Sequence, residues 1–315
     1  MHYLNPNRTF HLICLLTFAT LFPLSTASAQ SSFAYILQTD SFAKTKTAAI
    51  EKLAACGRDW IVLDAVFNSD TPWDRADLDA IRAGQPGRKI IAYLSIGEAE
   101  DYRPYWRKEW GTGGKLTSSA PKWLGAENPD WKGNYRVHYW HPEWQHLMLT
   151  AIDDAMARGF DGVYLDIVDA FETFEQSGKD FIDDRPNPET KQTYRRDMVD
   201  WVKAIATRAR AKNPDALVIP QNGSQLLAHA DFLDTISAIG IEDLFTNGNK
   251  LQPKAHTSYV LGHLQQMTAK KKPVLLIEYP KSIERQALTK QQAHDHGLIW
   301  LITDRPLKTL GTSGK

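Results

Sequence analysis

The sequence predicts a single (β/α)8 barrel whose eighth helix is short or missing. Eight short apolar runs rich in β-branched residues recur along the chain, stretches with helical periodicity separate them, and the chain has the length usual for this fold. Because the runs are continuously apolar rather than alternating, we expect parallel strands whose outer face is covered by helices. The runs are 33–37, 60–63, 89–94, 162–165, 217–219, 235–241, 273–277 and 298–302.

Five of the intervening segments have a clear helical period: 44–55, 74–82, 144–158, 194–211 and 257–269. Ser41 and Asp74 are favourable N-cap residues, and Gly57, Gly84 and Gly159 stand where helices should end. Few residues follow the eighth run, which leaves little chain for an eighth helix. An open doubly wound sheet is the alternative fold, but the first run is followed by Gln38-Thr39-Asp40 rather than by a glycine-rich phosphate loop.

Two predicted loops, 97–141 and 169–193, are long. They follow the third and fourth strands, at the end of a barrel where sites are built.

The first 29 residues have the pattern of a secretory signal peptide. Arg8 lies in a polar start, residues 10–24 are almost continuously apolar, and Ala27-Ser28-Ala29 fits a cleavage site. The apolar run is about 15 residues, short of the ~20 that a membrane-spanning helix needs. We therefore expect a domain of residues 30–315 that is secreted or periplasmic and free of the membrane after cleavage.

Charge and cysteine content exclude some functions for residues 30–315. This segment holds all 37 acidic residues and, since Arg8 precedes it, 36 of the 37 Lys and Arg residues. A nucleic-acid partner would call for a basic excess, so we expect none. Cys56 is the single cysteine after residue 29, which excludes an internal disulfide and indicates an inert thiol.

Acidic residues stand at or just after the ends of five predicted strands: Asp64, Glu98, Asp166, Glu242 and Glu278. Burying a carboxylate there is costly unless it is paired or functional. One of them could belong to a structural salt bridge, but five together favour a function.

Glycoside hydrolysis needs two carboxyl groups on opposite sides of a sugar bond. Asp166 and Glu242 end the fourth and sixth strands, two strand spacings of about 4.8 Å apart. Inward-leaning side chains would place the carboxyl groups about 5 to 9 Å apart, a range that leaves both retaining and inverting mechanisms open.

The loop after the third strand is rich in aromatic residues. Six of the ten tryptophans lie between residues 102 and 144. Flat rings stack on the apolar faces of sugars. The alternative is that these rings form a small core of the loop itself.

Other catalytic chemistries have weaker signals. His294-Asp295-His296 resembles a metal-binding pattern but precedes the eighth strand, at the end of the barrel opposite the long loops. No G-x-S-x-G motif marks a nucleophilic serine. We expect neither a metal nor a cofactor.

Several segments resemble glycoside hydrolase family 114. They are IAYLSIGEAEDYR (91–103), WLG (123–125) continuing to Trp131, DGVYLD (161–166), QNG (221–223) and GIED (240–243). The resemblance implies a (β/α)8 barrel acting as an endo-α-1,4-polygalactosaminidase on galactosamine-rich polysaccharide. It also implies that the ends of the fourth and sixth strands carry the catalytic pair, here Asp166 and Glu242. By analogy with other α-glycosidase barrels, Asp166 would be the nucleophile and Glu242 the general acid/base.

The hypothesis is therefore a monomeric, exported glycosidase. Glu242 would need a raised pKa while Asp166 stays ionised, and an acid-rich site would suit a cationic amino sugar. The expected substrate-lining residues are Asp64, Tyr93, Ser95, Glu98, Tyr102, Trp106, Tyr164, Asn222 and Tyr279. Competing hypotheses are a non-catalytic carbohydrate-binding barrel and a metal-dependent polysaccharide deacetylase.

Overall fold

The computed structural model describes residues 31–69 and 71–315, so the predicted signal peptide lies outside the described residues. All eight predicted strands form, and they run parallel to their neighbours. They are β1 (Phe33–Ile36), β2 (Trp60–Asp64), β5 (Lys89–Ser95), β11 (Gly162–Asp166), β14 (Leu217–Pro220), β15 (Ile239–Glu242), β18 (Val274–Glu278) and β19 (Ile299–Ile302).

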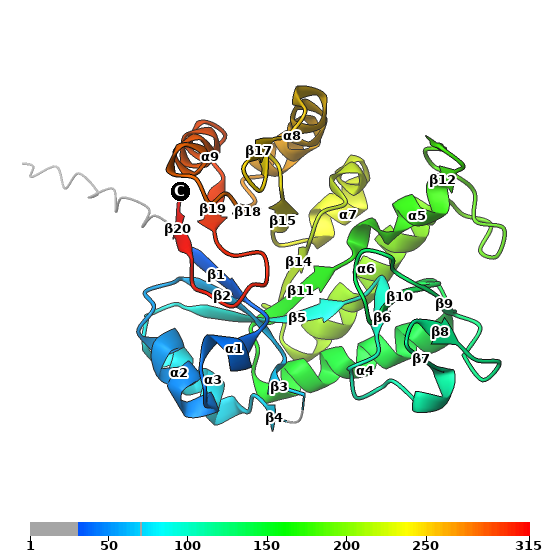
Figure 1. The fold of residues 1–315 in the computed structure, drawn as a ribbon, viewed down its shortest axis with the longest axis horizontal. Coiled ribbons are helices and arrows are strands. Elements are labelled where there is room, and N and C mark those ends of the chain that lie inside the picture. Colours follow the sequence, from blue (N-terminus) through cyan, green and yellow to red (C-terminus); the bar gives the residue numbers. More distant parts are fainter. Residues whose placement is uncertain (1–30, 70) are drawn as a thin grey trace, which may run out of the picture.

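The strands form two ladders that meet at two seams. β1-β2-β5-β11-β14 is one ladder, and β15-β18-β19 is the other, with the antiparallel strand β20 (Thr312–Gly314) at its edge. A single parallel bridge between Gln221 and Gly240 joins β14 to β15. At the second seam β20 lies beside β1, and the Phe33 N–H donates to Ser313 Oγ at 3.0 Å (Figure 1).

Helices cover the outside of the strands (Figure 1). They are α2 (Lys46–Ala54), α3 (Arg75–Ala83), α4 (Pro142–Arg158), α6 (Tyr194–Lys212), α7 (Ala230–Thr235), α8 (Lys254–Ala269) and α9 (Ile283–Asp295). Residues 303–315, which the structure describes in full, contain no helix, so the predicted absence of the eighth helix is confirmed.

The predicted helix ends are largely confirmed. Asp74 caps α3 in a reciprocal box with Asp77, and Gly84 and Gly159 follow the last turns of α3 and α4. The prediction for Ser41 was wrong: it lies inside a short helix, α1 (Thr39–Phe42), and Thr45 caps α2 instead.

Alternate residues of each strand point into the barrel. The interior is filled by a cluster that includes Tyr35, Tyr93, Tyr164, Ile219, Ile277 and Tyr279. Because side chains alternate with a period of two, Asp166, two residues after Tyr164, also faces inward. Glu242 faces inward for the same reason, four residues after the interior Ala238. Glu278 lies between two interior residues and therefore faces outward.

The two long loops are not structureless. Residues 97–141 hold a three-stranded sheet and a hairpin, formed by β6 (Glu98–Glu100), β7 (Gly111–Thr112), β8 (Lys115–Leu116), β9 (Leu124–Glu127) and β10 (Asn134–Val137). Residues 169–193 hold α5 (Phe171–Glu175) and the hairpin β12 (Gln176–Ser177)–β13 (Asp180–Phe181). Two further hairpins are β3 (Val66–Asn68)–β4 (Thr71–Pro72) and β16 (Thr246–Asn247)–β17 (Lys250–Leu251).

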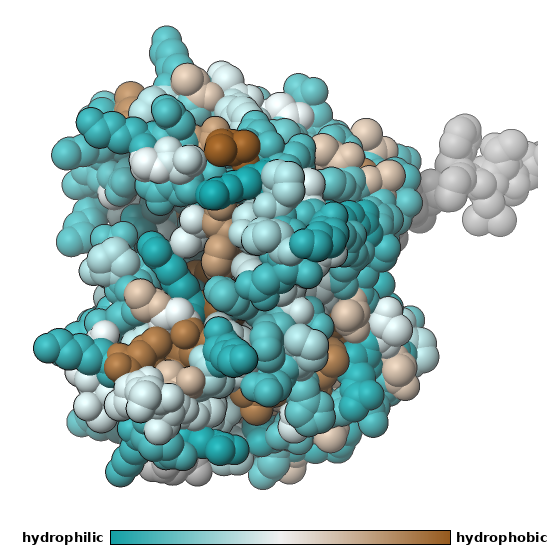
Figure 2. Space-filling model, turned by 90° about the vertical axis from the view of Figure 1, so that its right-hand side faces the viewer, coloured by the Kyte–Doolittle hydropathy of each residue, from teal (hydrophilic) through white to brown (hydrophobic). Residues whose placement is uncertain are grey.

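Figure 2 views the molecule from the side toward which β5 and β11 point in Figure 1. This face is mainly hydrophilic, with apolar residues in small groups, and it is hollowed near its middle. Among the described residues, no helix has the length and apolar character needed to span a membrane.

Candidate active site

Asp166 ends β11 and faces the barrel interior. The Tyr93 hydroxyl on β5 donates to its Oδ2 at 2.6 Å, and the Ile167 N–H donates to its Oδ1 at 2.8 Å. Burial raises the pKa of Asp166, while these two hydrogen bonds act in the opposite direction. Ile167 has a φ of +57°, a left-handed conformation that is costly for a β-branched residue and is found mainly where function requires it.

Glu242 ends β15 and also faces inward. Its carboxylate accepts a hydrogen bond from the Tyr279 hydroxyl on β18, and its backbone N–H donates to Asn222 Oδ1 at 3.1 Å. Burial, with a smaller contribution from the charge of Asp166, raises the pKa of Glu242 to about 7, although the Tyr279 hydrogen bond acts to lower it. A carboxyl group with this pKa can hold a proton near neutral pH, as a general acid must.

The expected raised pKa is found for Glu242, and the pKa of Asp166, which was expected to stay ionised, is raised as well. Burial moves the pKa of both carboxyl groups upward, because both stand above the same apolar interior. Neither Asp166 nor Glu242 forms an ion pair with another residue of 31–69 and 71–315. The pair is held by hydroxyl and backbone donors, not by cations.

The other three acids at strand ends have structural partners. Asp64 forms an ion pair with Arg103 at 2.8 Å, and Glu98 accepts from the Asn128 amide at 2.8 Å. Glu278 is fully buried and accepts from the backbone N–H groups of Phe245 at 2.7 Å and Thr246 at 3.1 Å. Glu278 therefore ties the chain after β15 to β18.

Three of the expected lining residues contact the pair directly: Tyr93 and Tyr279 donate to the carboxyl groups, and Asn222 accepts from the Glu242 N–H. Tyr102 is 56% exposed, and it donates to Glu100. Ser95 is buried and donates to the Glu98 carbonyl at 2.9 Å, within the turn after β5.

Two other expected substrate contacts, Tyr164 and Trp106, pack against other side chains in this structure. Tyr164 has no exposed surface; it lies beneath the pair and donates to Gln221. Trp106 packs against Tyr135 with ring centres 4.7 Å apart, inside a small aromatic core with Trp110. For Trp106, the alternative that the loop's rings form their own core describes this structure.

Gly240 makes the close packing beneath the pair possible. A Cβ atom at this position would lie 1.8 Å from the Tyr164 hydroxyl and 2.3 Å from Gln221 Oε1. The absence of a side chain therefore allows β15 to approach β14 and β11 one layer below Glu242.

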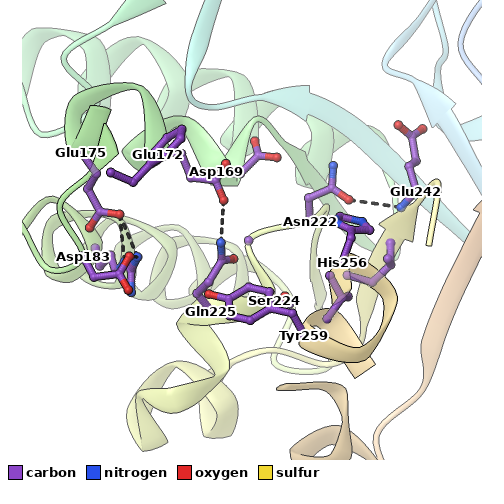
Figure 3. A pocket seen from close by; sticks show the side chains of 15 residues that line it. Asp169, Glu172, Glu175, Asp183, Asn222, Ser224, Gln225, Glu242, His256 and Tyr259 are labelled. Carbon is purple, nitrogen blue, oxygen red and sulfur yellow. Dashed lines mark hydrogen bonds and ion pairs between the residues drawn. The ribbon is translucent and has the colours of Figure 1, made fainter. Parts of the chain in front are cut away.

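A cavity of about 400 Å³ opens beside Glu242 and extends toward α5 and α8 (Figure 3). Asn222 lies at its inner end, where its Oδ1 accepts from the Glu242 N–H, and its side chain acts to lower the pKa of Asp169. Burial and the nearby charges of Glu172 and Asp166 raise the pKa of Asp169 to about 8. Tyr259, on α8, lines the cavity and is 49% exposed.

The cavity is strongly acidic. Five carboxylate residues line it, and Arg195 is its single arginine, already paired with Glu175 at 2.9 Å and Asp183 at 2.5 Å. Sequence reasoning missed Asp169 and Glu172. The signal that could have found them is their position within two turns of Asp166, on the chain that leaves β11.

The described part of the chain contains no group of three or more His, Cys, Asp or Glu side chains able to hold a metal ion. His294-Asp295-His296 lies at the end of α9 with its side chains exposed to solvent.

The model of the family described as Glycoside-hydrolase family GH114 matches residues 25–314, almost the whole chain. The chain belongs to glycoside-hydrolase family GH114. The resemblance inferred from the sequence is thereby confirmed, and hydrolysis of glycosidic bonds is the activity of the class. The ends of β11 and β15 in this family member bear the two inward carboxyl groups described above.

Relatives and solved structures agree with this membership. The chain is 37% identical to an uncharacterized protein of Deinococcus radiodurans, covering 79% of this chain and 74% of the relative. It is 34% identical to the uncharacterized protein MJ1477 of Methanocaldococcus jannaschii, covering 74% of this chain and 64% of the relative.

Two solved structures show the same fold. The glycoside hydrolase domain of PelA from Pseudomonas aeruginosa superposes with a TM-score of 0.65 at 18% identity, over 90% of this chain and 98% of that domain. Aspergillus fumigatus Ega3 in complex with galactosamine superposes with a TM-score of 0.63 at 19% identity, over 88% of this chain and 92% of that one. The predicted barrel fold is confirmed.

Proposed function

We propose that this protein is an exported endo-glycosidase that cleaves α-1,4 linkages in galactosamine-containing polysaccharide, with Asp166 as nucleophile and Glu242 as general acid/base. The observation that carries the proposal is the contrast among the five acids at strand ends. Asp64, Glu98 and Glu278 are occupied by structural partners, whereas Asp166 and Glu242 face the barrel interior together and form none of the ion pairs of the described residues.

The surroundings of the two carboxyl groups suit different roles. In the first step Glu242 donates its proton to the glycosidic oxygen while Asp166 attacks the anomeric carbon, and the leaving chain departs as an alcohol. In the second step Glu242 takes a proton from water, and the resulting hydroxide displaces Asp166 from the sugar. The Tyr93 hydrogen bond stabilises the ionised Asp166, which attacks in the first step and leaves the sugar in the second.

The acidic cavity supports a cationic substrate. Glu172 lines it and takes part in none of the ion pairs of the described residues, so an ammonium group of an amino sugar would meet a carboxylate that no cation neutralises. Asp169, whose pKa is raised to about 8, would be favoured in its charged form by the same ammonium group. Tyr259 offers a partly exposed ring to a sugar face. The galactosamine found with the solved Ega3 structure is consistent with this choice. The α-1,4 linkage rests on family membership.

The proposal is tested with protein comprising residues 30–315 and a panel of polymers: polygalactosamine, its N-acetylated form, chitosan and a neutral galactan. We expect shortening of polygalactosamine, seen by sizing the products, and loss of cleavage with retained binding in Asp166→Asn and Glu242→Gln. Binding without cleavage by the unmodified protein would instead support a carbohydrate-binding barrel.

A further inference from the structure

The chain that replaces the eighth helix brings a cation next to Glu242. After β19 the residues 303–311 turn back over the rim, and this segment carries Arg305. The Arg305 guanidinium lies 4.3 Å from the centre of the Tyr279 ring and donates to both carboxylate oxygens of Asp243, at 2.9 and 3.0 Å. Sequence reasoning assigned no role to Arg305 or Asp243.

The contacts of Arg305 reach two residues that adjoin Glu242, the proposed general acid. Asp243 follows Glu242 in the chain and has a left-handed φ of +50°. Tyr279 donates its hydroxyl to the Glu242 carboxylate, and Arg305 holds the ring of that tyrosine. Glu242 is therefore connected to Arg305 by two routes, through the phenol of Tyr279 and through its own neighbour Asp243.

The segment that carries Arg305 is itself anchored. The Leu307 carbonyl accepts from the Leu37 N–H at 2.9 Å, across the seam of the barrel. Thr309 donates its hydroxyl to Asp304, and the Thr303 hydroxyl donates to the Thr309 carbonyl at 3.2 Å. These bonds fix the backbone on both sides of Arg305.

We propose that Arg305 is a positioning residue that acts through Tyr279: it holds the phenol against the Glu242 carboxyl group and offsets the charge of Asp243 beside it. This inference rests on the proposed role of Glu242 as the acid. Contact with the face of Tyr279 restricts rotation of the ring, and the two hydrogen bonds from Arg305 Nη2 to Asp243 hold the guanidinium over it.

The charged groups around Glu242 determine whether loss of Arg305 raises or lowers the pKa of Glu242. The titratable groups that face it are Tyr35 on β1, Tyr164 and Asp166 on β11, Tyr279 on β18, the adjacent Asp243, Arg305 after β19, and His256 on α8, which lines the same cavity. The Tyr279 hydrogen bond and the charge of Arg305 both lower the pKa of Glu242, while Asp166 and Asp243 raise it. Loss of Arg305 should therefore raise that pKa.

If Arg305 formed only an ordinary surface salt bridge, its removal would have a different effect on catalysis. The Arg305 side chain is 42% exposed, and an isolated pair of this kind contributes little to stability. If Arg305 only paired with Asp243, its removal would leave the pH dependence of catalysis unchanged.

The experiment compares kcat/KM against pH for Arg305→Met, Arg305→Lys and the control Lys308→Met, which removes an exposed cation from the same segment. For Arg305→Met we expect a roughly tenfold fall in kcat and a shift of the alkaline limb upward by about one pH unit, the size expected for one nearby charge at a partly hydrated rim. Arg305→Lys should keep the alkaline limb near its original pH but lose part of kcat, because lysine retains the charge without the planar stack. Lys308→Met should match the unmodified protein.

A double variant provides the sharper control. In Arg305→Met/Asp243→Asn the unpaired carboxylate is also removed, so the alkaline limb should return toward its original pH while kcat stays low. An unshifted limb in Arg305→Met, or an equal shift in Lys308→Met, would overturn the inference.

A carboxyl-carbon NMR titration of Glu242 in the free protein separates this inference from the proposed function. It reads the pKa change in Arg305→Met without substrate. Failure of the unmodified protein to cleave any polymer would count against the function, whereas an unchanged Glu242 titration would count against the role of Arg305.

Discussion

The Tyr93 hydroxyl lies 2.6 Å from Oδ2 of Asp166, so a phenol on one strand stabilises the charge of a carboxylate on the next. Tyr93→Phe removes this donor and leaves the ring in place. A hydrogen bond to a charged group contributes about 1.5–3 kcal/mol, so we expect kcat/KM to fall about 10- to 100-fold and its acid limb to move to higher pH. Steady-state kinetics across pH measure both, and an unchanged acid limb would show that Tyr93 does not act on Asp166.

Glu242 should define the alkaline limb of activity in the unmodified protein. Burial raises the pKa of Glu242 to about 7, and a general acid works only while protonated. Activity should therefore decline as pH rises through about 7. The limb should be absent from Glu242→Gln supplied with an activated aryl glycoside, whose leaving group needs no protonation. Persistence of the same limb in that variant would assign it to another group.

Glu278, unlike Glu242, should affect the stability of the protein and not its catalytic activity. Burial raises its pKa from 4.5 to about 7, so the native state binds this proton more tightly than the unfolded state does. That contribution to stability is fully present below pH 4.5 and is lost as pH rises through about 7.

In Glu278→Gln the side-chain oxygen can still accept from Phe245 and Thr246. The free energy of unfolding, measured with denaturant at pH 5 and pH 8, should then vary less with pH than in the unmodified protein. We expect kcat to stay within about twofold, because the side chain faces away from the barrel interior. A large loss of kcat with normal stability would place Glu278 in the chemistry.

Gly240→Ala should damage the layer beneath the pair. The added methyl group would overlap the Tyr164 hydroxyl, and overpacking of this kind costs about 1–3 kcal/mol. We expect a lower free energy of unfolding together with a loss of kcat, since β15 would have to move and carry Glu242 with it. Gly262→Ala on α8, where an added Cβ meets no atom within 4 Å, is the matched control and should leave both unchanged.

Chelation tests the competing metal-dependent deacetylase. After incubation with EDTA and dialysis, we expect cleavage of polygalactosamine at the original rate. Release of acetate from the N-acetylated polymer that EDTA abolishes and Zn²⁺ restores would favour the deacetylase.

The sequence was sufficient for the barrel but not for the site. Eight apolar runs and their intervening helices follow from periodicity, which is a local property. The pairing of Arg305 with Asp243 and the bond from the Glu242 N–H to Asn222 join residues at or just beyond the ends of different strands, and nothing in their spacing indicates them. Glu278 is an intermediate case. Its place between Ile277 and Tyr279 already implied an outward side chain, because only alternate residues face the interior.

The last strand has a consequence for how the chain folds. Phe33 and Ser313, which meet at the seam, are 280 residues apart in sequence, so their contact closes almost the longest loop that the domain can form. Contacts of such separation form late, because the intervening chain must be ordered first. During synthesis the sheet would remain open, with one edge of β1 unpaired, until residues 312–314 have been made. Barrel closure, and with it the anchoring of the segment that holds Arg305, is then the step that completes the rim.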